Sequence, residues 1–214
     1  SDSGGGAGIQ ADLKTFSALG VFGASALTAV TAQNTLGVKH FEMVSVPLVV
    51  AQIEAVLDDL GADAVKTGML GTPAVVEAVA ATLRARYAGP VVVDPVMVAK
   101  SRDRLLSAEA VESLRGALLP LAAVITPNGP EAEVLTGLEV RTEAQAREAA
   151  RRLHALGPRA VIVKGGHLET PDVVDLLFDG ERFVEARGPR HPTRHTHGTG
   201  CTFAAAIAAG LARG

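Results

Sequence analysis

The sequence predicts an α/β fold in which a mostly parallel central sheet carries helices on both faces, giving three αβα layers. Apolar runs of strand length alternate along the chain with longer runs of helical period, as in sheets whose parallel strands are joined by helices. The inner strand-like runs around Val92 and Ile162 are continuously apolar, which is typical of strands buried on both faces. An Asp179-Gly180 pair between two further apolar runs predicts an antiparallel hairpin at the sheet edge.

Strands are placed where a short apolar run stops at polar or turn-forming residues. The hairpin joins the last two of these segments. The predicted strands are Phe22–Thr31, Ala64–Thr67, Val91–Asp94, Val124–Thr126, Ala160–Lys164, Val173–Phe178 and Arg182–Glu185.

Helices are placed on the longer segments of helical period. Pro73 and Ser107 lie where helices should begin, and Gly20, Gly61 and Gly157 follow predicted helix ends. The predicted helices are Gln10–Leu19, Leu48–Leu60, Ala74–Arg86, Ala108–Leu118, Glu131–Leu135 and Glu143–Leu156, with a further small-residue helix after Cys201.

Composition narrows the class of protein. The 214 residues suit one domain, over residues 1–214, with a sizeable core. A net charge of −3 and 3% aromatic residues argue against nucleic-acid and anionic-membrane partners. The single cysteine, Cys201, excludes an intramolecular disulfide and fits a reducing, cytoplasmic setting. No stretch approaches the roughly 20 apolar residues of a membrane span, and the N-terminal residues do not resemble a signal peptide.

Polar and turn-forming residues follow successive predicted strands at the same end. Ligands of open parallel sheets bind beyond the carboxyl ends of the strands. We therefore expect a site built from the segments 33–34, 66–69, 94–97, 126–128 and 164–167.

The segment Gly198-Thr199-Gly200-Cys201 leads directly into a helix of small residues. Glycines let backbone approach a ligand, and the unpaired first amides of a helix attract anions such as phosphate. A glycine-rich turn before a packed helix is an equally good interpretation of the local pattern. Cys201 could be a base or substrate contact with a lowered pKa, or a small buried hydrophobe. The spacing of a Walker A loop is absent.

Other strand ends carry charged side chains. Lys164 could bridge ATP phosphates or simply extend from a strand end. Asp94, Asn128 and Glu131 offer the oxygen ligands that Mg²⁺ prefers. Asn128 could instead cap a helix, with Glu131 as a first-turn charge. A second glycine-rich turn at residues 1–8 could wrap backbone around a small substrate or be a flexible tail.

Seven segments together resemble one family along nearly the whole chain. They are residues 1–16, 31–35, 66–70, 94–101, 130–135, 163–167 and 196–202. In this order they are similar to the hydroxymethylpyrimidine/phosphomethylpyrimidine kinases of thiamine biosynthesis, within the ribokinase-like superfamily.

The resemblance implies two ATP-dependent phosphorylations, of 4-amino-5-hydroxymethyl-2-methylpyrimidine and then of its monophosphate. It implies that Gln33 binds the pyrimidine edge, because an amide both donates and accepts hydrogen bonds. ATP and Mg²⁺ would be the cofactors. The implied roles are pyrimidine-pocket residues Met69, Val96, Ala7 and Asp12; nucleotide contacts Lys164, Asn128 and Thr199; Mg²⁺ ligands Glu131 and Asp94; and an anion hole of Gly198, Thr199, Gly200 and Cys201.

Two departures qualify the resemblance. The wider superfamily pattern places Asp after the Gly-x-Gly turn, where this chain has Cys201. Relatives usually carry a strand before the first turn and more helix after the last one, so part of each pocket is expected outside this chain. A pyridoxal or pyridoxine kinase is the alternative enzyme, and a non-catalytic pyrimidine sensor is the alternative of another class. The sequence is compatible with a homodimer.

Overall fold

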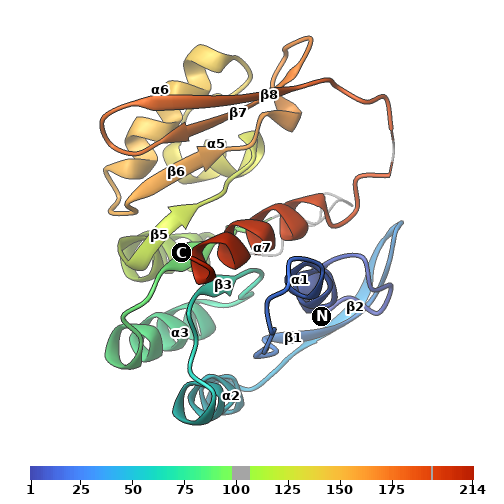
Figure 1. Cartoon of the computed structure of the whole chain (residues 1–214), viewed down its shortest axis with the longest axis vertical. Coiled ribbons are helices and arrows are strands. Elements are labelled where there is room, and N and C mark those ends of the chain that lie inside the picture. Colours follow the sequence, from blue (N-terminus) through green and yellow to red (C-terminus); the bar gives the residue numbers. More distant parts are fainter. Residues whose placement is uncertain (98–106, 194) are drawn as a thin grey trace.

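The computed structural model describes residues 1–97, 107–193 and 195–214, and its centre is a six-stranded sheet (Figure 1). The strand order is β3-β4-β5-β6-β7-β8. The first four strands are parallel, and β7 and β8 are antiparallel to their neighbours. The strands are β3 (Val65–Thr67), β4 (Val91–Val93), β5 (Ala122–Ile125), β6 (Ala160–Val163), β7 (Val173–Phe178) and β8 (Phe183–Gly188).

Helices cover both faces of this sheet, as the sequence predicts. On one face, Val92 of β4 packs against Ala204 and Ala208 of α7, and α1 lies beside α7 (Figure 1). The helices are α1 (Gly8–Ala18), α2 (Val46–Asp59), α3 (Pro73–Arg86), α4 (Ala108–Ser113), α5 (Gly129–Thr136), α6 (Glu143–His154) and α7 (Thr199–Ala212).

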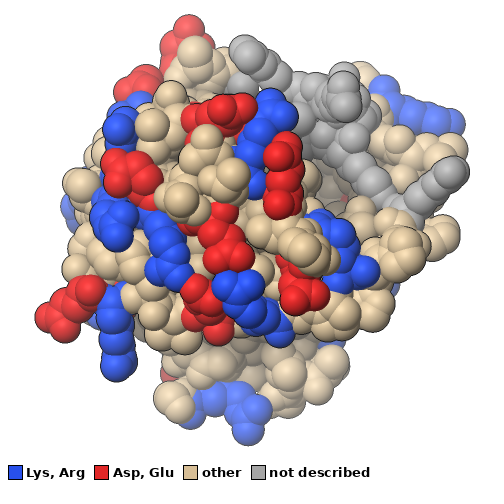
Figure 2. All heavy atoms as spheres, turned by 90° about the horizontal axis from the view of Figure 1, so that it is seen from above, with Lys and Arg blue, Asp and Glu red and all other residues tan. Residues whose placement is uncertain are grey.

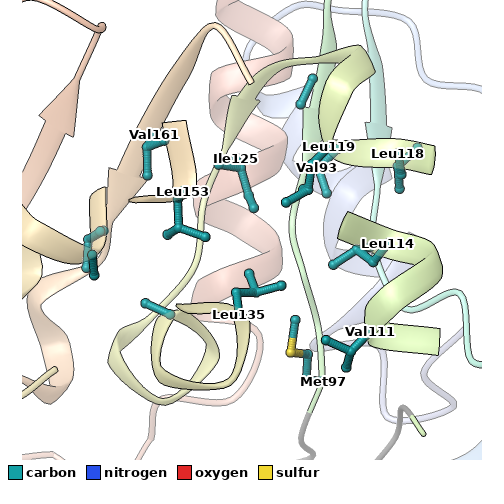
Figure 3. Packing of buried hydrophobic residues seen from close by; sticks show 14 of the residues in the cluster. Val93, Met97, Val111, Leu114, Leu118, Leu119, Ile125, Leu135, Leu153 and Val161 are labelled. Atoms are coloured by element: carbon teal, nitrogen blue, oxygen red, sulfur yellow. The ribbon is translucent and has the colours of Figure 1, made fainter. Parts of the chain in front are cut away.

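The larger core lies on the opposite face. Figure 3 shows Val93 and Ile125 of the sheet packed with Leu114, Leu135 and Leu153 from three helical segments. Alternate residues of a strand point to opposite faces, which explains why Val92 and Val93 belong to different clusters. The three-layer prediction is therefore confirmed.

The predicted strand at Phe22–Thr31 is wrong. The strand β1 covers Ala29–Asn34 and pairs with β2 (Gly37–Met43) in a separate two-stranded sheet. The backbone of Leu27 is held instead by Gln52 of α2, whose side-chain amide bonds both its N–H and its carbonyl. Phe22 is 84% exposed, so its apolar character does not mark a buried strand.

Most predicted helix boundaries hold to within two residues, with one change of geometry. Thr72 and Ser107 cap α3 and α4 with their side chains. The helix predicted to run to Leu118 widens into a π-helical turn over Leu114–Leu118. Pro120 lies in the short 3₁₀ turn that follows and has no N–H to continue a helix.

Charges of both signs alternate on the face formed by the β7–β8 end of the sheet (Figure 2). Arg187 of β8 pairs with Glu143 of α6 at 3.0 Å, and Arg147 of α6 pairs with Glu185 of β8. This face therefore presents no large patch of a single sign (Figure 2). Among the helices of the described residues, none combines the length and apolar character needed to cross a membrane.

Candidate active site

One large cavity opens beside the carboxyl ends of the parallel strands and has a volume of about 1390 Å³. Its lining extends beyond the strand ends to apolar residues of α2 such as Ile53 and Leu57. Every candidate residue from the sequence lines it. These are Ala7, Asp12, Gln33, Met69, Asp94, Val96, Asn128, Glu131, Lys164, Gly198, Thr199, Gly200 and Cys201.

Lys164 forms the centre of the cavity's charged side. It follows β6, and its Nζ lies 3.0 Å from Asp94 Oδ1 and 3.9 Å from Glu131 Oε2. Thr126 Oγ1 donates to the same Asp94 oxygen at 3.2 Å. Asp94 follows β4 and Thr126 follows β5, so three neighbouring parallel strands place these groups. The predicted convergence is confirmed for the segments after β4, β5 and β6, but segment 33–34 belongs to the separate two-stranded sheet and not to this edge.

Asn128 and Glu131 also have the structural role that the sequence allowed, because they cap the start of α5. Asn128 Oδ1 accepts from Glu131 N–H, and Glu131 Oε2 accepts from Asn128 N–H, which is a capping box at the start of α5. Burial raises the pKa of Glu131 to about 7, against the opposing effect of the Lys164 ammonium and with a further upward contribution from Asp94. Glu131 therefore changes its charge near neutral pH.

The turn before α7 approaches two other parts of the cavity closely. Gly198 has a φ of 79°, and a Cβ at this position would lie 1.7 Å from the Gly6 carbonyl oxygen. A Cβ on Gly200 would lie 3.3 Å from Lys164 Nζ. Within the described residues no side chain caps α7, and the first amides of a helix have no intrahelical partners. The start of α7 at Gly200 thus lies beside the Lys164 ammonium, and a helix N-terminus next to a cation suits an anion.

Cys201 lies in the first turn of α7 and is partly buried. Burial raises the pKa of its thiol; the Lys66 ammonium opposes this shift, but Asp94 adds to it. Cys201 is therefore a neutral thiol at pH 7 in the free protein. This protonation state does not suit a general base and favours a positional role.

Asp12 has a partner that sequence reasoning missed. Lys66 Nζ contacts both carboxylate oxygens of Asp12 at 3.0 Å, and the Lys66 side chain is only 3% exposed. Burial opposes the charge on Lys66, but nearby negative charges, those of the Asp12 and Asp94 carboxylates among them, outweigh it and raise its pKa. The sequence offered a signal, because Lys66 lies inside the predicted strand Ala64–Thr67, next to the expected site. The Asp12 carboxylate is occupied by this ion pair.

Gln33 lies on the other side of the cavity, in β1 of the two-stranded sheet. Its Oε1 lies 3.2 Å from Thr31 Oγ1. Its backbone N–H donates to Ser3 Oγ, and its carbonyl accepts from the same hydroxyl. The contact between Gln33 Oε1 and Thr31 Oγ1 fixes the orientation of the Gln33 side-chain amide, including its NH₂ group. Ala7, Met69 and Val96 line the same cavity and supply apolar surface for a ring.

The carboxylates near Lys164 fit a magnesium ion that is held mainly through phosphate oxygens. No cluster of three or more His, Cys, Asp or Glu side chains that could hold a metal occurs in residues 1–97, 107–193 and 195–214. Mg²⁺ is commonly bound by one or two carboxylates together with water and substrate phosphates. Asp94 and Glu131 meet that requirement in number and in chemistry, and Lys164 Nζ already lies near both.

Comparisons with known proteins agree with this arrangement. A hydroxymethylpyrimidine/phosphomethylpyrimidine kinase of Rhizobium meliloti is 54% identical over 215 residues, covering 100% of this chain and 80% of the relative. The thiamine biosynthesis bifunctional protein ThiED of Geobacter sulfurreducens is 55% identical over 214 residues; that match covers 100% of this chain and 44% of the relative.

A solved structure shares the fold. The ADP complex of Bacillus subtilis pyridoxal kinase matches with a TM-score of 0.91 and 42% identity, covering 100% of this chain and 81% of that one. This likeness confirms the ribokinase-like architecture that the sequence resemblance implied. The family model described as phosphomethylpyrimidine kinase matches residues 2–214. The chain belongs to the phosphomethylpyrimidine kinase family.

Proposed function

We propose that the protein transfers the γ-phosphoryl group of ATP to hydroxymethylpyrimidine and then to its monophosphate, giving the pyrimidine diphosphate of thiamine biosynthesis. One observation carries the proposal. The charged cluster of Lys164, Asp94 and Glu131 and the ring-binding residue Gln33 line a single cavity. A phosphate donor would therefore bind beside Lys164, and a heteroaromatic acceptor beside Gln33, in the same cavity.

In the first step, the hydroxymethyl oxygen attacks the γ-phosphorus of ATP. A new P–O bond forms, the bond between the γ-phosphorus and the β–γ bridging oxygen breaks, ADP leaves and the hydroxyl proton is released. Phosphoryl transfer passes through a loose transition state, so positioning and charge stabilisation matter more than a strong base. The neutral Cys201 thiol agrees with that chemistry.

The charge that develops on the γ-phosphoryl oxygens would be stabilised by groups already in place. The Lys164 ammonium and the N-terminus of α7 lie side by side at Gly200. Fixed donors of this kind stabilise a transition state without reorganising. Asp94 and Glu131 would hold Mg²⁺ together with ATP, and the ion would neutralise charge on the transferred phosphate.

In the second step, a phosphate oxygen of the pyrimidine monophosphate would replace the alcohol oxygen as the nucleophile. The bonds formed and broken at the γ-phosphorus are the same. The acceptor is now an anion, so the cationic and N–H-lined side of the cavity near Lys164 must also offset its charge. Gln33 and Lys164 line the same cavity, so this larger acceptor would still lie between the ring-binding residue and the charged cluster.

A pyridoxal kinase is the second candidate, and the likeness to the Bacillus subtilis structure is the specific observation in its favour. Gln33 favours the pyrimidine. Its amide can donate to a ring nitrogen and accept from an amino group, the pair of groups that an aminopyrimidine presents. Pyridoxal carries no amino group next to a ring nitrogen.

A non-catalytic pyrimidine sensor is the remaining alternative. Such a domain would bind the ring and would have no need for groups that stabilise a transferred phosphate. The chain retains Lys164, Glu131 and the Gly198–Cys201 turn, all lining the cavity. These residues support catalysis over sensing.

Mass spectrometry of products tests the proposal. The protein is incubated with ATP, Mg²⁺ and hydroxymethylpyrimidine, with pyridoxal in a parallel reaction and the Lys164→Ala variant as the control. Pyrimidine monophosphate followed by diphosphate is the expected result. Monophosphate alone would restrict the activity to the first step. Pyridoxal phosphate as the only product would favour the second candidate, and binding without any product would favour the sensor.

A further inference from the structure

The Asp2 carboxylate accepts several hydrogen bonds within the N-terminal turn, residues 1–8. The residue is 1% exposed. Its Oδ1 accepts from Gly4 N–H at 2.8 Å, and its Oδ2 accepts from Gly6 N–H at 3.0 Å and Ala7 N–H at 2.8 Å. Burial alone would raise the pKa of Asp2, but hydrogen bonds from His197 and from these amides outweigh it and lower the pKa. Asp2 is thus an ionised carboxylate, and its hydrogen bonds hold the N-terminal turn in one conformation.

The fourth partner of Asp2 comes from the far end of the chain. His197 Nε2 lies 2.7 Å from Asp2 Oδ2, although 195 residues separate them in sequence. The His197 side chain is 14% exposed. A short hydrogen bond to an ionised acceptor is among the stronger ones in proteins. The contact therefore joins the N-terminal turn to the segment that enters α7.

The two turns also touch through their backbones next to this contact. A Cβ on Gly198 would collide with the Gly6 carbonyl oxygen at 1.7 Å, and a Cβ on Gly6 would lie 2.7 Å from His197 Cδ2. The space between the turns is therefore filled. The His197 ring occupies part of this space, so its removal would leave a gap beside Gly6.

The N-terminal turn is joined on its other side to the strand that carries Gln33. Ser3 Oγ donates to the Gln33 carbonyl at 2.7 Å and accepts from the Gln33 N–H at 2.8 Å. Thr31 Oγ1, which also contacts Gln33 Oε1, donates to the Ser1 carbonyl at 2.9 Å. A continuous set of contacts thus runs from Gln33 through Asp2 to His197 and Gly198.

We propose that Asp2 and His197 form a positioning pair that fixes the distance between the pyrimidine-binding residues and the anion-binding turn. This inference rests on the proposed function and deepens it. Neither side chain acts on the reacting atoms. The pair instead sets where the acceptor oxygen lies relative to the transferred phosphoryl group.

The pair should act on turnover more than on binding. Gln33 and Lys164 remain intact when the pair is broken, so each substrate still finds its own contacts. Misplacement of reacting groups by about 1 Å can cost about 10²-fold in rate. We expect His197→Ala to lower kcat about 10- to 100-fold and to change each KM by less than about threefold.

Three variants and one control make the test specific. His197→Gln keeps an amide N–H donor near the position of Nε2, so it should recover most of kcat. Asp2→Asn places an NH₂ where one of the carboxylate oxygens now accepts, so it should lose kcat like His197→Ala. The double variant should be no slower than the slower single variant, because paired residues are not additive. His195→Ala, two residues earlier and exposed, should match the wild type.

Hydrogen exchange supplies a readout that needs no activity. His197→Ala should speed exchange of the amides at residues 4–7, which lie in the opposite turn, as well as those at 198–201. Faster exchange confined to residues 196–201 would overturn the inference. So would additive losses in the double variant, or a kcat within twofold of the wild type in His197→Ala.

A failure of the proposed function would give different results from a failure of the Asp2–His197 pair. A wild type that makes no pyrimidine phosphate contradicts the function, while the exchange experiment still decides the pair. If the wild type phosphorylates only pyridoxal, the same kcat losses are expected with that acceptor. A wild type with full pyrimidine kinase activity and unaffected variants contradicts the pair alone.

Discussion

The phosphate side and the pyrimidine side of the cavity are built by different means. Asp94 follows β4 and Lys164 follows β6. Both strands are buried and belong to one parallel sheet. Gln33 lies in a separate two-stranded sheet and is tied to the N-terminal turn by hydrogen bonds to Ser3. The two sides meet through contacts between helices and turns. The charged side is held by the pairing of neighbouring strands, whereas the Gln33 side is held by individual hydrogen bonds to a turn.

This difference in construction indicates which functional property can change on each side of the cavity. A strand end fixes a charge relative to its neighbours for as long as the sheet exists, which suits a reaction common to many kinases. A two-stranded sheet outside the core can change its side chains and its position with little effect on the central sheet. We infer that acceptor preference is set on the Gln33 side and phosphoryl transfer on the Lys164 side.

The largest expected effect concerns the link between the two sides. Lys66 of β3 pairs with Asp12 of α1, and Lys66→Met would leave a buried carboxylate without its cation. Loss of one partner of a buried pair costs about 3–5 kcal/mol in the free energy of unfolding. Urea unfolding measures this loss. Lys39→Met, at an exposed position in β2, is the control and should be nearly neutral.

The double variant Lys66→Met/Asp12→Leu sharpens the test, because it removes both charges together. It should regain most of the stability lost in the single variant. A single variant as stable as the wild type would show that the ion pair does not join α1 to the sheet.

The next effect isolates the phosphate side. Lys164→Ala removes the cation beside Gly200, and loss of one such donor typically slows turnover about 10²- to 10³-fold. Steady-state kinetics should show this fall in kcat, while calorimetry should show pyrimidine binding unchanged. Lys39→Ala serves as the matched control. Turnover within twofold of the wild type would remove Lys164 from the reaction.

The third effect is a pH dependence of stability on the phosphate side. Burial raises the pKa of Glu131 from 4.5 to about 7 in the folded protein. Between these pH values the folded state binds the proton that the unfolded state has released, so stability falls as the pH rises. Glu131→Gln removes the titration, and its side-chain oxygen can still accept from Asn128 N–H.

Relative to that variant, the wild type should lose about 1–3 kcal/mol of unfolding free energy between pH 4.5 and pH 7. Urea unfolding at a series of pH values measures the difference. A difference that is constant with pH would show that the pKa of Glu131 is not raised in the folded protein.

The smallest expected effect isolates the pyrimidine side. Gln33→Ala removes the amide but leaves the apolar walls, so hydroxymethylpyrimidine binding should weaken by about 1–3 kcal/mol, or roughly 5- to 150-fold. Calorimetry with each ligand alone should show nucleotide binding unchanged. His40→Ala, at an exposed position in β2, is the control. Equal losses for both ligands would break the distinction between the two sides.

The same contrast explains how much could be predicted from the sequence. Lys164 and Asp94 were predictable because buried strands end at them and parallel strands end at one edge. The position of Gln33 was not predictable from strand patterns, because the strand expected at Phe22–Thr31 is actually β1 at Ala29–Asn34. Segment 33–34 was expected at the site for the wrong reason, as the end of that strand, and the role of Gln33 came from the family resemblance.

The long-range pairs could not be predicted from the sequence. Lys66 and Asp12 are 54 residues apart, and Asp2 and His197 are 195 residues apart. No local periodicity links such positions, and only the folded chain brings them into contact. Cys201 was left open between base and positional residue, and its burial beside Asp94 raises the pKa and favours the positional role.

A competition assay tests the central claim most directly. Equal concentrations of hydroxymethylpyrimidine and pyridoxal are mixed with ATP, Mg²⁺ and the wild-type protein, and both phosphorylated products are followed over time. The two-sided cavity predicts that pyrimidine monophosphate appears first, that the diphosphate follows, and that pyridoxal phosphate stays a minor product. Pyridoxal phosphate as the main product, or no phosphorylated product, would contradict the account.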